Sequence, residues 1–153
     1  MKRIGISALL FMVMLSLLLI SVSGHIHKYR QAAFSRASWL GDTKTMRVLL
    51  AAGADVNEPI AAYINPLVAA SESGNPEAIH LLLDHRADIN QRDEYGWTAL
   101  MYAAGAGQVK SVQVLISRGA DVSAVGRRGS ALSIATQTNH PEIVNILKQA
   151  GAR

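Results

Sequence analysis

The sequence predicts an all-α solenoid of about four helix-turn-helix units, preceded by an N-terminal signal or anchor helix. Its 153 residues are 50% hydrophobic but only 5% aromatic, which favours one domain built on many small aliphatic contacts. The second observation is self-similarity, because one short string returns twice at an interval of 33 residues. Internal periods of about 20–50 residues indicate stacked repeats. The three copies are LLAAGADVN at 49–57, LLDHRADIN at 82–90 and LISRGADVS at 115–123.

Residues 1–23 have the composition of a signal peptide or a membrane anchor. Two cations precede an uncharged apolar run, Ile4–Val22, that shows no polar face. Its 19 residues lie between the about 7–15 of a secretory signal and the about 20 of a spanning helix. Small residues form an acceptable cleavage pattern just before Gly24, so a cleaved signal is favoured over an uncleaved anchor. Residues 24–30 are expected to form a short linker.

The charges around this run predict that the remaining chain lies outside the cytoplasm. Cations before an apolar segment favour a cytoplasmic start, although Lys28 and Arg30 just beyond it weaken the asymmetry. The short basic start is typical of bacterial export, so the expected location is periplasmic or secreted after signal cleavage. The alternative is anchoring to the inner membrane through residues 4–22, with the repeats outside the cytoplasm. The chain has no cysteine, which permits an oxidising location without proving one.

The first unit, residues 31–57, is degenerate. It keeps Gly41, the pair Leu49 and Leu50, and the GADVN turn, but it lacks the helix-opening motif of the later units. Terminal repeats are expected to be atypical, because one of their faces meets solvent instead of a neighbour. The segment therefore still counts as a repeat.

The second unit, residues 58–90, has two helix starts of the same kind. Asn65 and Asn75 are good N-cap residues, and each is followed by a proline at the first helical position, where the missing N–H is tolerated. Gly74 ends the first helix. The buried stripe of the second helix is expected to contain Ile79, Leu82 and Leu83.

The third unit, residues 91–123, repeats this pattern in other letters. Thr98 is expected to cap the first helix, because its hydroxyl can accept one of the N–H groups left without a partner there. Gly107 and Gly119 end the two helices. The buried stripes are expected to contain Leu100, Ala103 and Ala104, and then Val112, Leu115 and Ile116.

The fourth unit, residues 124–153, is one residue shorter. Ser130 is the expected cap of its first helix, and His140 with Pro141 opens the second. The deletion falls in the connecting loop SAVGRRGS, and loops tolerate length changes best. Lys148 and Gln149 suit a solvated end of the array.

These motifs resemble those of the ankyrin repeat family. The resemblance covers about residues 31–153 and implies an ankyrin repeat solenoid. One departure is consistent: the histidine of the family's Thr-Pro-Leu-His motif is replaced by Val68, Met101 and Ser133. A somewhat weaker network between repeats is therefore expected. The matching strings are NPLVAAS with RADIN, TALMYAA with GADVS, SALSIAT with GAR, and the lone GADVN.

The resemblance also implies where a partner would bind. In the family, loop tips and first-helix faces line a concave surface that holds another protein. Tyr63 stands where Gly96 stands one unit later, so the first loop is expected to differ in shape. An alternative for the aromatic and basic tips is that they cover neighbouring loops or solvate the rim. The corresponding positions are Ala61, Ala62 and Ile64, then Glu94, Tyr95 and Trp97, then Arg127 and Arg128.

Catalytic and metal chemistry find little support. No serine lies in a nucleophile elbow, and the glycines mark repeat ends, not a phosphate loop. Asp55, Asp88 and Asp121 recur at the repeat period, which indicates a turn role. A net charge of +4 is too small to indicate nucleic-acid binding. We therefore predict no catalytic residue, no metal site and no cofactor.

The sequence thus predicts a monomeric, non-enzymatic protein-binding module that acts outside the cytoplasm. One alternative is an immunity or inhibitor protein that blocks a toxic secreted enzyme. A less favoured alternative, of another class, is an envelope enzyme or metal-handling protein that uses His25 and His27. The identity of the partner does not follow from the chain.

Overall fold

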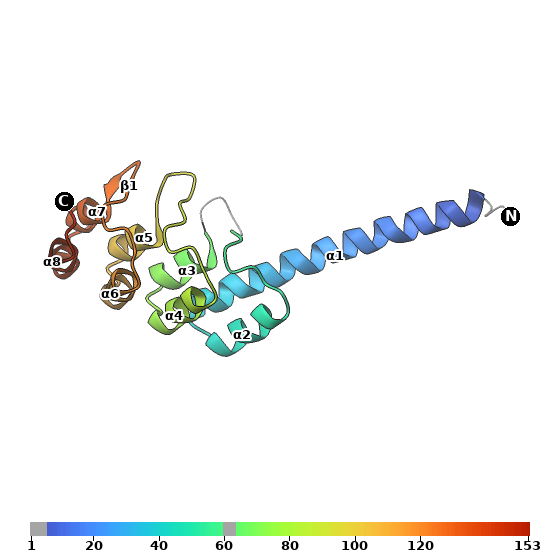
Figure 1. Cartoon of the computed structure of the whole chain (residues 1–153), viewed down its shortest axis with the longest axis horizontal. Helices are drawn as coiled ribbons and strands as arrows, with labels where there is room; N and C mark the ends of the chain where they lie inside the picture. Colours follow the sequence, from blue (N-terminus) through green and yellow to red (C-terminus); the bar gives the residue numbers. More distant parts are fainter. Residues whose placement is uncertain (1–5, 60–63) are drawn as a thin grey trace.

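The computed structural model describes residues 6–59 and 64–153, with side chains from Val22 onward. The described part is an all-α repeat array, as predicted, with one very short antiparallel hairpin (Figure 1). Its helices are α1 (Ile6–Leu40), α2 (Thr43–Ala51), α3 (Pro66–Glu72), α4 (Pro76–Asp84), α5 (Ala99–Gly105), α6 (Val109–Ser117), α7 (Ala131–Gln137) and α8 (Pro141–Gln149). The hairpin consists of β1 (Val125–Gly126) and β2 (Gly129–Ser130).

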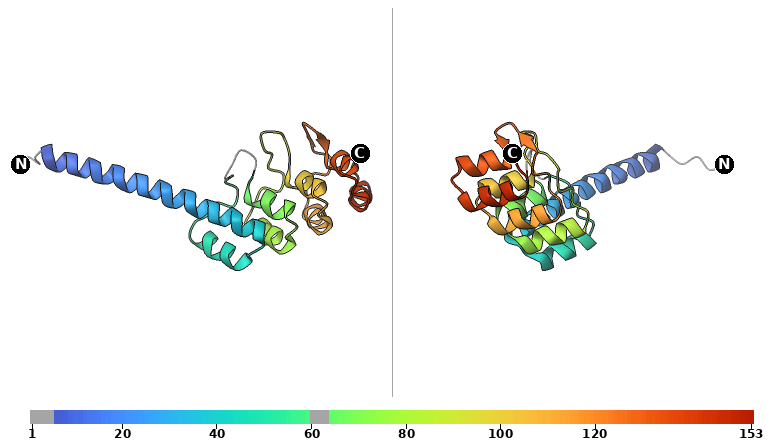
Figure 2. Two further views of the ribbon diagram at one scale, coloured as in Figure 1. Left: turned by 180° about the vertical axis from the view of Figure 1, so that it is seen from behind. Right: turned by 60° about the vertical axis from the view of Figure 1, so that its left-hand side comes forward.

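The helices stack in two rows (Figure 2). The end of α1 packs on α3, α3 on α5 and α5 on α7, whereas α2, α4, α6 and α8 form the second row. The loop before α5 and the β1–β2 hairpin project from the same edge of the array (Figure 1). This arrangement places the loop tips next to the first-row helices.

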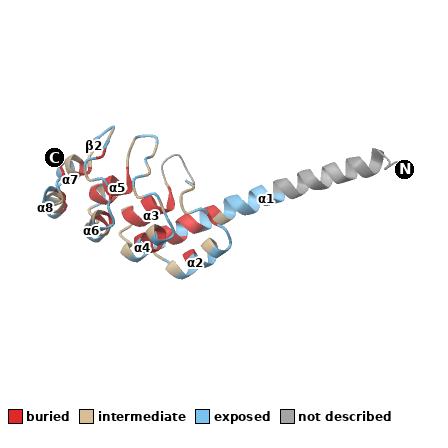
Figure 3. Ribbon diagram, viewed as in Figure 1, coloured by how far each residue is buried: buried red, intermediate tan, exposed pale blue. Residues whose placement is uncertain are grey.

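One continuous apolar core runs between the two rows (Figure 3). Small alanines on the first-row helices, such as Ala70, Ala103 and Ala135, are fully buried and allow the helices to approach closely. Each unit adds large aliphatic or aromatic side chains between them: Phe34 and Met46, Ile79 and Leu82, Leu100 and Leu115, Ile143 and Leu147. No unit can bury these side chains alone, so the array is stabilised by its interfaces.

The first unit takes its first helix from the end of α1. Burial begins at Gln31 and continues through Phe34, Ala37 and Ser38, and this helix packs on both α2 and α3. The expectation of a linker at 24–30 is wrong, because these residues are an uninterrupted part of α1. The segment contains no proline, and a single glycine costs a helix only about 1 kcal/mol relative to alanine, which the long helix tolerates.

The helices start at the predicted residues, but the predicted capping hydrogen bond does not form at every one of them. The side chains of Asn65 and Ser130 accept the N–H groups of Val68 and Ser133, as expected for N-caps. The prediction for Thr98 is wrong in its chemistry, since its hydroxyl caps nothing and is buried without a protein partner. Asn75 likewise makes no cap bond, and its side-chain Nδ2 instead donates to the Trp39 carbonyl at 2.6 Å, which links the second unit to the first.

Asparagines in the turns connect each unit to the next. Asn57 accepts the Asp88 N–H at 2.8 Å, and Asn90 accepts the Asp121 N–H at 2.9 Å. The Asp88 carboxylate in turn accepts the Asn90 N–H at 3.0 Å within its own turn. The recurring aspartates therefore order the turns, as their period predicted, and the asparagines link them across units.

The apolar run Ile4–Val22 lies, except for its last residue, outside the side chains that the structure describes. Among the residues searched for a membrane span, which are the described ones, no helix is both long and apolar enough to cross a bilayer.

Candidate functional site

The loop before α5 is organised by Asp93. Its carboxylate accepts the Tyr95 N–H at 2.9 Å, the Trp97 N–H at 2.7 Å and the Tyr102 hydroxyl at 2.7 Å. The first two bonds close the turn around Gly96, whose φ of +75° lies in the left-handed region. The third bond ties the loop to α5. One carboxylate thus fixes three aromatic residues relative to one another.

The β1–β2 hairpin lies directly against this loop. The Arg127 N–H donates to the Tyr95 carbonyl at 3.0 Å, and Arg92 Nη1 donates to the Val125 carbonyl at 2.8 Å. Gly126 sits so close that a Cβ atom there would lie 3.0 Å from the Gly96 oxygen. The two loops therefore form one joined edge, with Arg127 and Arg128 at the turn between the strands.

The arginines of the hairpin stack on the aromatic side chains of the loop. Arg127 Cζ lies 5.3 Å from the centroid of the Tyr95 ring, and Arg128 Cζ lies 5.7 Å from that of Trp97. Trp97 and Tyr102 pack with ring centroids 5.1 Å apart in a tilted arrangement. These contacts are cation–π and aromatic pairs of the kind that hold rings in fixed orientations.

These five side chains line a groove of about 550 Å³, which we call the aromatic groove: Tyr95, Trp97, Tyr102, Arg127 and Arg128. A smaller hollow of about 250 Å³ adjoins it over α5 and α7 and shares Trp97, Tyr102 and Arg128 with it. Glu72, at the end of α3, lines this hollow. Burial raises the pKa of the Glu72 carboxyl, because a carboxylate loses hydration there.

The structure brings together four of the residues predicted to bind a partner: Tyr95, Trp97, Arg127 and Arg128. Glu94 is exposed and lines a separate hollow of about 90 Å³ beside Pro59. Ile64 is half-buried and lines none of these grooves, and Ala61 and Ala62 lie outside the described residues. The predicted surface is therefore divided, with its second and third loops forming one groove.

Sequence reasoning missed Tyr102, Asp93 and Glu72. Tyr102 lies in α5, where the sequence pattern draws attention only to the apolar residues that are predicted to form the core. It is half-buried, and its exposed side carries the groove. An aromatic residue that precedes two alanines and lies off the predicted buried stripe is the signal that the sequence offers. The role of Asp93 depends on a loop conformation that no repeat period encodes.

Another hollow, of about 540 Å³, opens beside α2. Arg47 and Asp55 from the first unit and His85 from the second line it, over a floor that includes Leu50 and Val56. Its lining contains no tyrosine or tryptophan and no joined loop pair, so it offers fewer fixed binding groups than the aromatic groove.

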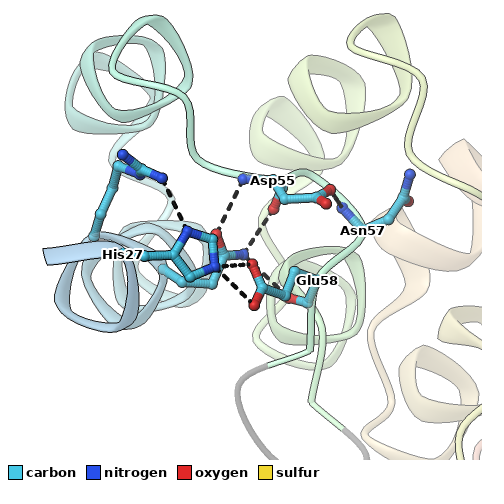
Figure 4. Close-up of polar contacts among 6 residues, drawn as sticks. His27, Asp55, Asn57 and Glu58 are labelled. Carbon is cyan, nitrogen blue, oxygen red and sulfur yellow. Dashed lines mark hydrogen bonds and ion pairs between the residues drawn. The ribbon is translucent and has the colours of Figure 1, made fainter. Parts of the chain in front are cut away.

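His27, near the start of the described side chains, takes part in a polar contact between α1 and the first turn. His27 Nε2 lies 2.8 Å from Glu58 Oε2, and its Nδ1 lies 3.0 Å from Arg30 Nη2 (Figure 4). A neutral ring that donates from Nε2 and accepts at Nδ1 satisfies both contacts. No group of three metal-ligating side chains occurs among the residues that the structure describes.

Comparison with known families gives one match. The family model for ankyrin repeats, in three copies, matches residues 34–126 and 67–153. Together these ranges span 120 of the 153 residues. No curated protein matches the chain. Ankyrin repeats are general protein–protein interaction modules, and the family is typically non-enzymatic.

Proposed function

Because this chain belongs to the ankyrin repeat family, we propose that it binds a partner protein through the aromatic groove and has no catalytic role. The observation that carries this proposal is the joining of two loops into one edge that presents two aromatic–arginine stacks. Tyrosine, tryptophan and arginine are the residue types that most often dominate binding energy at interfaces. Here they come from two adjacent units and meet at one groove.

Preorganisation supports the same conclusion. Binding is weakened by the ordering of flexible side chains, at about 0.5–1.5 kcal/mol for each one immobilised. In the groove, Tyr102 is held by Asp93, Trp97 packs on Tyr102, and Arg128 stacks on Trp97. A partner therefore meets a surface whose side chains already have defined positions.

We propose that binding takes place outside the cytoplasm, in the periplasm or after secretion. The support is the apolar run with cations before it, and anchoring to the inner membrane through residues 4–22 is the alternative. The intact mass of protein purified from its own cells distinguishes the two. Loss of the first 23 residues means cleavage, whereas a full-length mass in the membrane fraction means an anchor. Full-length protein in the cytosol would contradict both.

The binding proposal is tested by site-specific photo-crosslinking in cells. A benzophenone amino acid replaces Glu94, an exposed residue next to Tyr95 in the same loop, or Gln113, an exposed residue of α6 in the second row. We expect a discrete protein adduct from position 94 that is absent from position 113. The adduct should also be lost when Trp97→Ala, or Arg127→Ala with Arg128→Ala, is added. Adducts that are equal at both positions, or insensitive to these substitutions, would contradict the proposed surface.

A further inference from the structure

We propose that the aromatic groove selects an acidic partner segment, in which a carboxylate side chain lies next to an apolar one. This inference rests on the proposed function and specifies the chemistry of the partner. It commits to a protein segment with aspartate or glutamate at the hairpin end of the groove and an apolar side chain against Trp97 and Tyr102. The argument comes from charge, from the orientation of the guanidinium groups and from the polarity of the groove.

The positive charge of the hairpin is not neutralised within the described chain. Among the described residues, a basic side chain contacts a carboxylate in two pairs, His27 with Glu58 and Arg118 with Asp84, and the first is an ion pair only when His27 is protonated. Arg127 and Arg128 are exposed and belong to neither pair. Two adjacent guanidinium groups at one turn repel each other, and a bound carboxylate relieves that repulsion.

Stacking orients these guanidinium groups for a carboxylate. A guanidinium packed by its face on an aromatic ring keeps its N–H edges available for hydrogen bonds. Those edges match the two oxygens of a carboxylate, which accept paired N–H groups in a planar arrangement. The Cζ atoms of Arg127 and Arg128 lie over the Tyr95 and Trp97 rings, at 5.3 Å and 5.7 Å from the ring centroids, which leaves room for this orientation.

The nearby acidic side chains form no ion pair with Arg127 or Arg128 among the described residues. The Asp93 carboxylate is occupied by Tyr95, Trp97 and Tyr102 inside the loop. Glu94 lines the separate hollow beside Pro59. The hairpin end of the groove is therefore its cationic end.

The position of Glu72 makes the two ends of the groove different in charge. It lines the adjoining hollow, and a second carboxylate placed there would be repelled by the ionised Glu72 side chain. An acidic residue of the partner is consequently directed to Arg127 and Arg128. A neutral or basic residue of the same segment would lie toward Glu72. The apolar residue between them packs on Trp97 and Tyr102, which line both hollows.

The inference is tested by fluorescence titration of the full chain carrying Trp39→Phe, which leaves Trp97 as the single tryptophan. The probes are blocked octapeptides of alternating Asp and Leu, alternating Lys and Leu, and alternating Ser and Leu, together with an oligothymidine of eight nucleotides. We expect the Asp/Leu peptide to bind at least about tenfold more tightly than the other peptides, with an affinity that falls as salt is raised. The double substitution Arg127→Glu and Arg128→Glu should reverse the preference in favour of the Lys/Leu peptide.

A matched control separates the groove from the net charge. Lys110→Glu with Lys148→Glu makes the same change in net charge on exposed positions of α6 and α8, and should leave the preference for Asp/Leu in place. Circular dichroism confirms that each variant is folded before titration. Arg127→Lys with Arg128→Lys keeps the charge but not the planar edges, and should bind Asp/Leu with intermediate affinity.

The outcomes distinguish this inference from the proposed function. Equal binding of the three peptides, no binding of any, or tighter binding of the oligothymidine overturns the acidic preference. A position-dependent crosslink from residue 94 would still support a protein partner in each of these cases. Conversely, selective Asp/Leu binding with no crosslink in cells supports the inference and contradicts the proposed function.

Discussion

The side chain of Gln31 forms hydrogen bonds with both backbone groups of Asp55, the N–H and the carbonyl. The Gln31 carboxamide accepts the Asp55 N–H at 3.0 Å and donates to the Asp55 carbonyl at 2.7 Å. It also donates to the Glu58 carbonyl at 3.1 Å. Asn57 and Asn90 bind the N–H groups of the next two recurring aspartates, so α1 supplies the first member of the same series. The long N-terminal helix is thereby part of the repeat network.

Gln31→Ala should lower the free energy of unfolding by about 2–4 kcal/mol. Gln31 is 3% exposed and makes three hydrogen bonds, each with a net contribution of about 1 kcal/mol, and its loss leaves buried backbone groups without partners. Urea unfolding followed by circular dichroism measures the change. Gln149→Ala, at an exposed position of α8, is the control and should change stability by less than about 0.5 kcal/mol.

Tyr102→Phe should weaken partner binding at the groove and destabilise the fold by about 1 kcal/mol. The substitution keeps the ring against Trp97 but removes the bond to Asp93 that ties the loop to α5. Thermal unfolding and the yield of the residue-94 crosslink are the two measurements. Tyr29→Phe, at a position that is 73% exposed on α1, should change neither. An unaltered crosslink in Tyr102→Phe would show that the hydroxyl does not position the groove.

Gly126→Ala should separate the two loops. A Cβ atom at this position would lie 2.8 Å from Trp97 Cδ1 and 3.0 Å from the Gly96 oxygen, so the hairpin would have to move. We expect the fluorescence of Trp97, measured with Trp39→Phe, to shift toward longer wavelength as the ring gains water. Gly24→Ala is the contrasting control, because no atom lies within 4 Å and alanine favours a helix by about 1 kcal/mol. It should leave the Trp97 spectrum unchanged.

Thr98→Val should not destabilise the protein, in contrast to Asn65→Ala. The two residues have the same position at their helix starts, yet only Asn65 caps its helix, and it also donates to Gln91 at 2.8 Å. Asn65→Ala should cost about 1–2 kcal/mol. Thr98→Val replaces a buried hydroxyl that has no protein partner with a methyl group, so stability should stay constant or rise. A loss above about 1 kcal/mol for Thr98→Val would reveal a bond that this structure does not contain.

Glu72→Gln should stabilise the protein in a manner that depends on pH. Burial raises the pKa of Glu72 in the folded state, so the folded protein retains this proton to higher pH than the unfolded chain does. The contribution of Glu72 to stability is therefore present below its unfolded-state pKa and is lost as pH rises through the raised folded-state value. Urea unfolding of both proteins between about pH 3 and pH 8 measures the difference. The variant should gain relative to the parent chain across the range above about pH 4, the ordinary glutamate pKa, and the gain should level off at neutral pH.

The repeat architecture was predictable because the same residue pattern recurs in several units of the sequence. The period places the recurring aspartates in turns, the recurring glycines near helix ends and the recurring leucines in the core, and a position that is ambiguous in one unit can be assigned from the others. Examples are Asp88 and Asp121, Gly74 and Gly107, and Leu82 and Leu115. Features that occur once were harder to predict. The β1–β2 hairpin lies in the loop with the deletion, and two-residue strands leave no periodic pattern. The helical path of residues 24–30 depends on the helix at both ends of that segment, not on its own composition.

The candidate site was predictable only in part for the same reason. Trp97 and Arg128 were found because the family places partner contacts at loop tips. Their stacking depends on the close approach of Gly96 and Gly126, which belong to different units. Asp93 acts through three bonds in one particular turn, and such a turn is set by tertiary contacts. The proposed direction of the groove likewise depends on Glu72, which is distant in sequence from both loops.

Helix α1 runs without interruption from Ile6 into the first repeat, a length of about 52 Å at about 1.5 Å per residue. The C-terminal part of this rigid helix is anchored in the repeat stack through the buried side chains of Phe34 and Gln31. Within Ile6–Leu40 the helix has no break that could act as a hinge between its N-terminal part and the repeat array. Any structure that holds the N-terminal end of α1 therefore determines the orientation of the whole repeat array. It also determines the direction from which a partner can approach the aromatic groove.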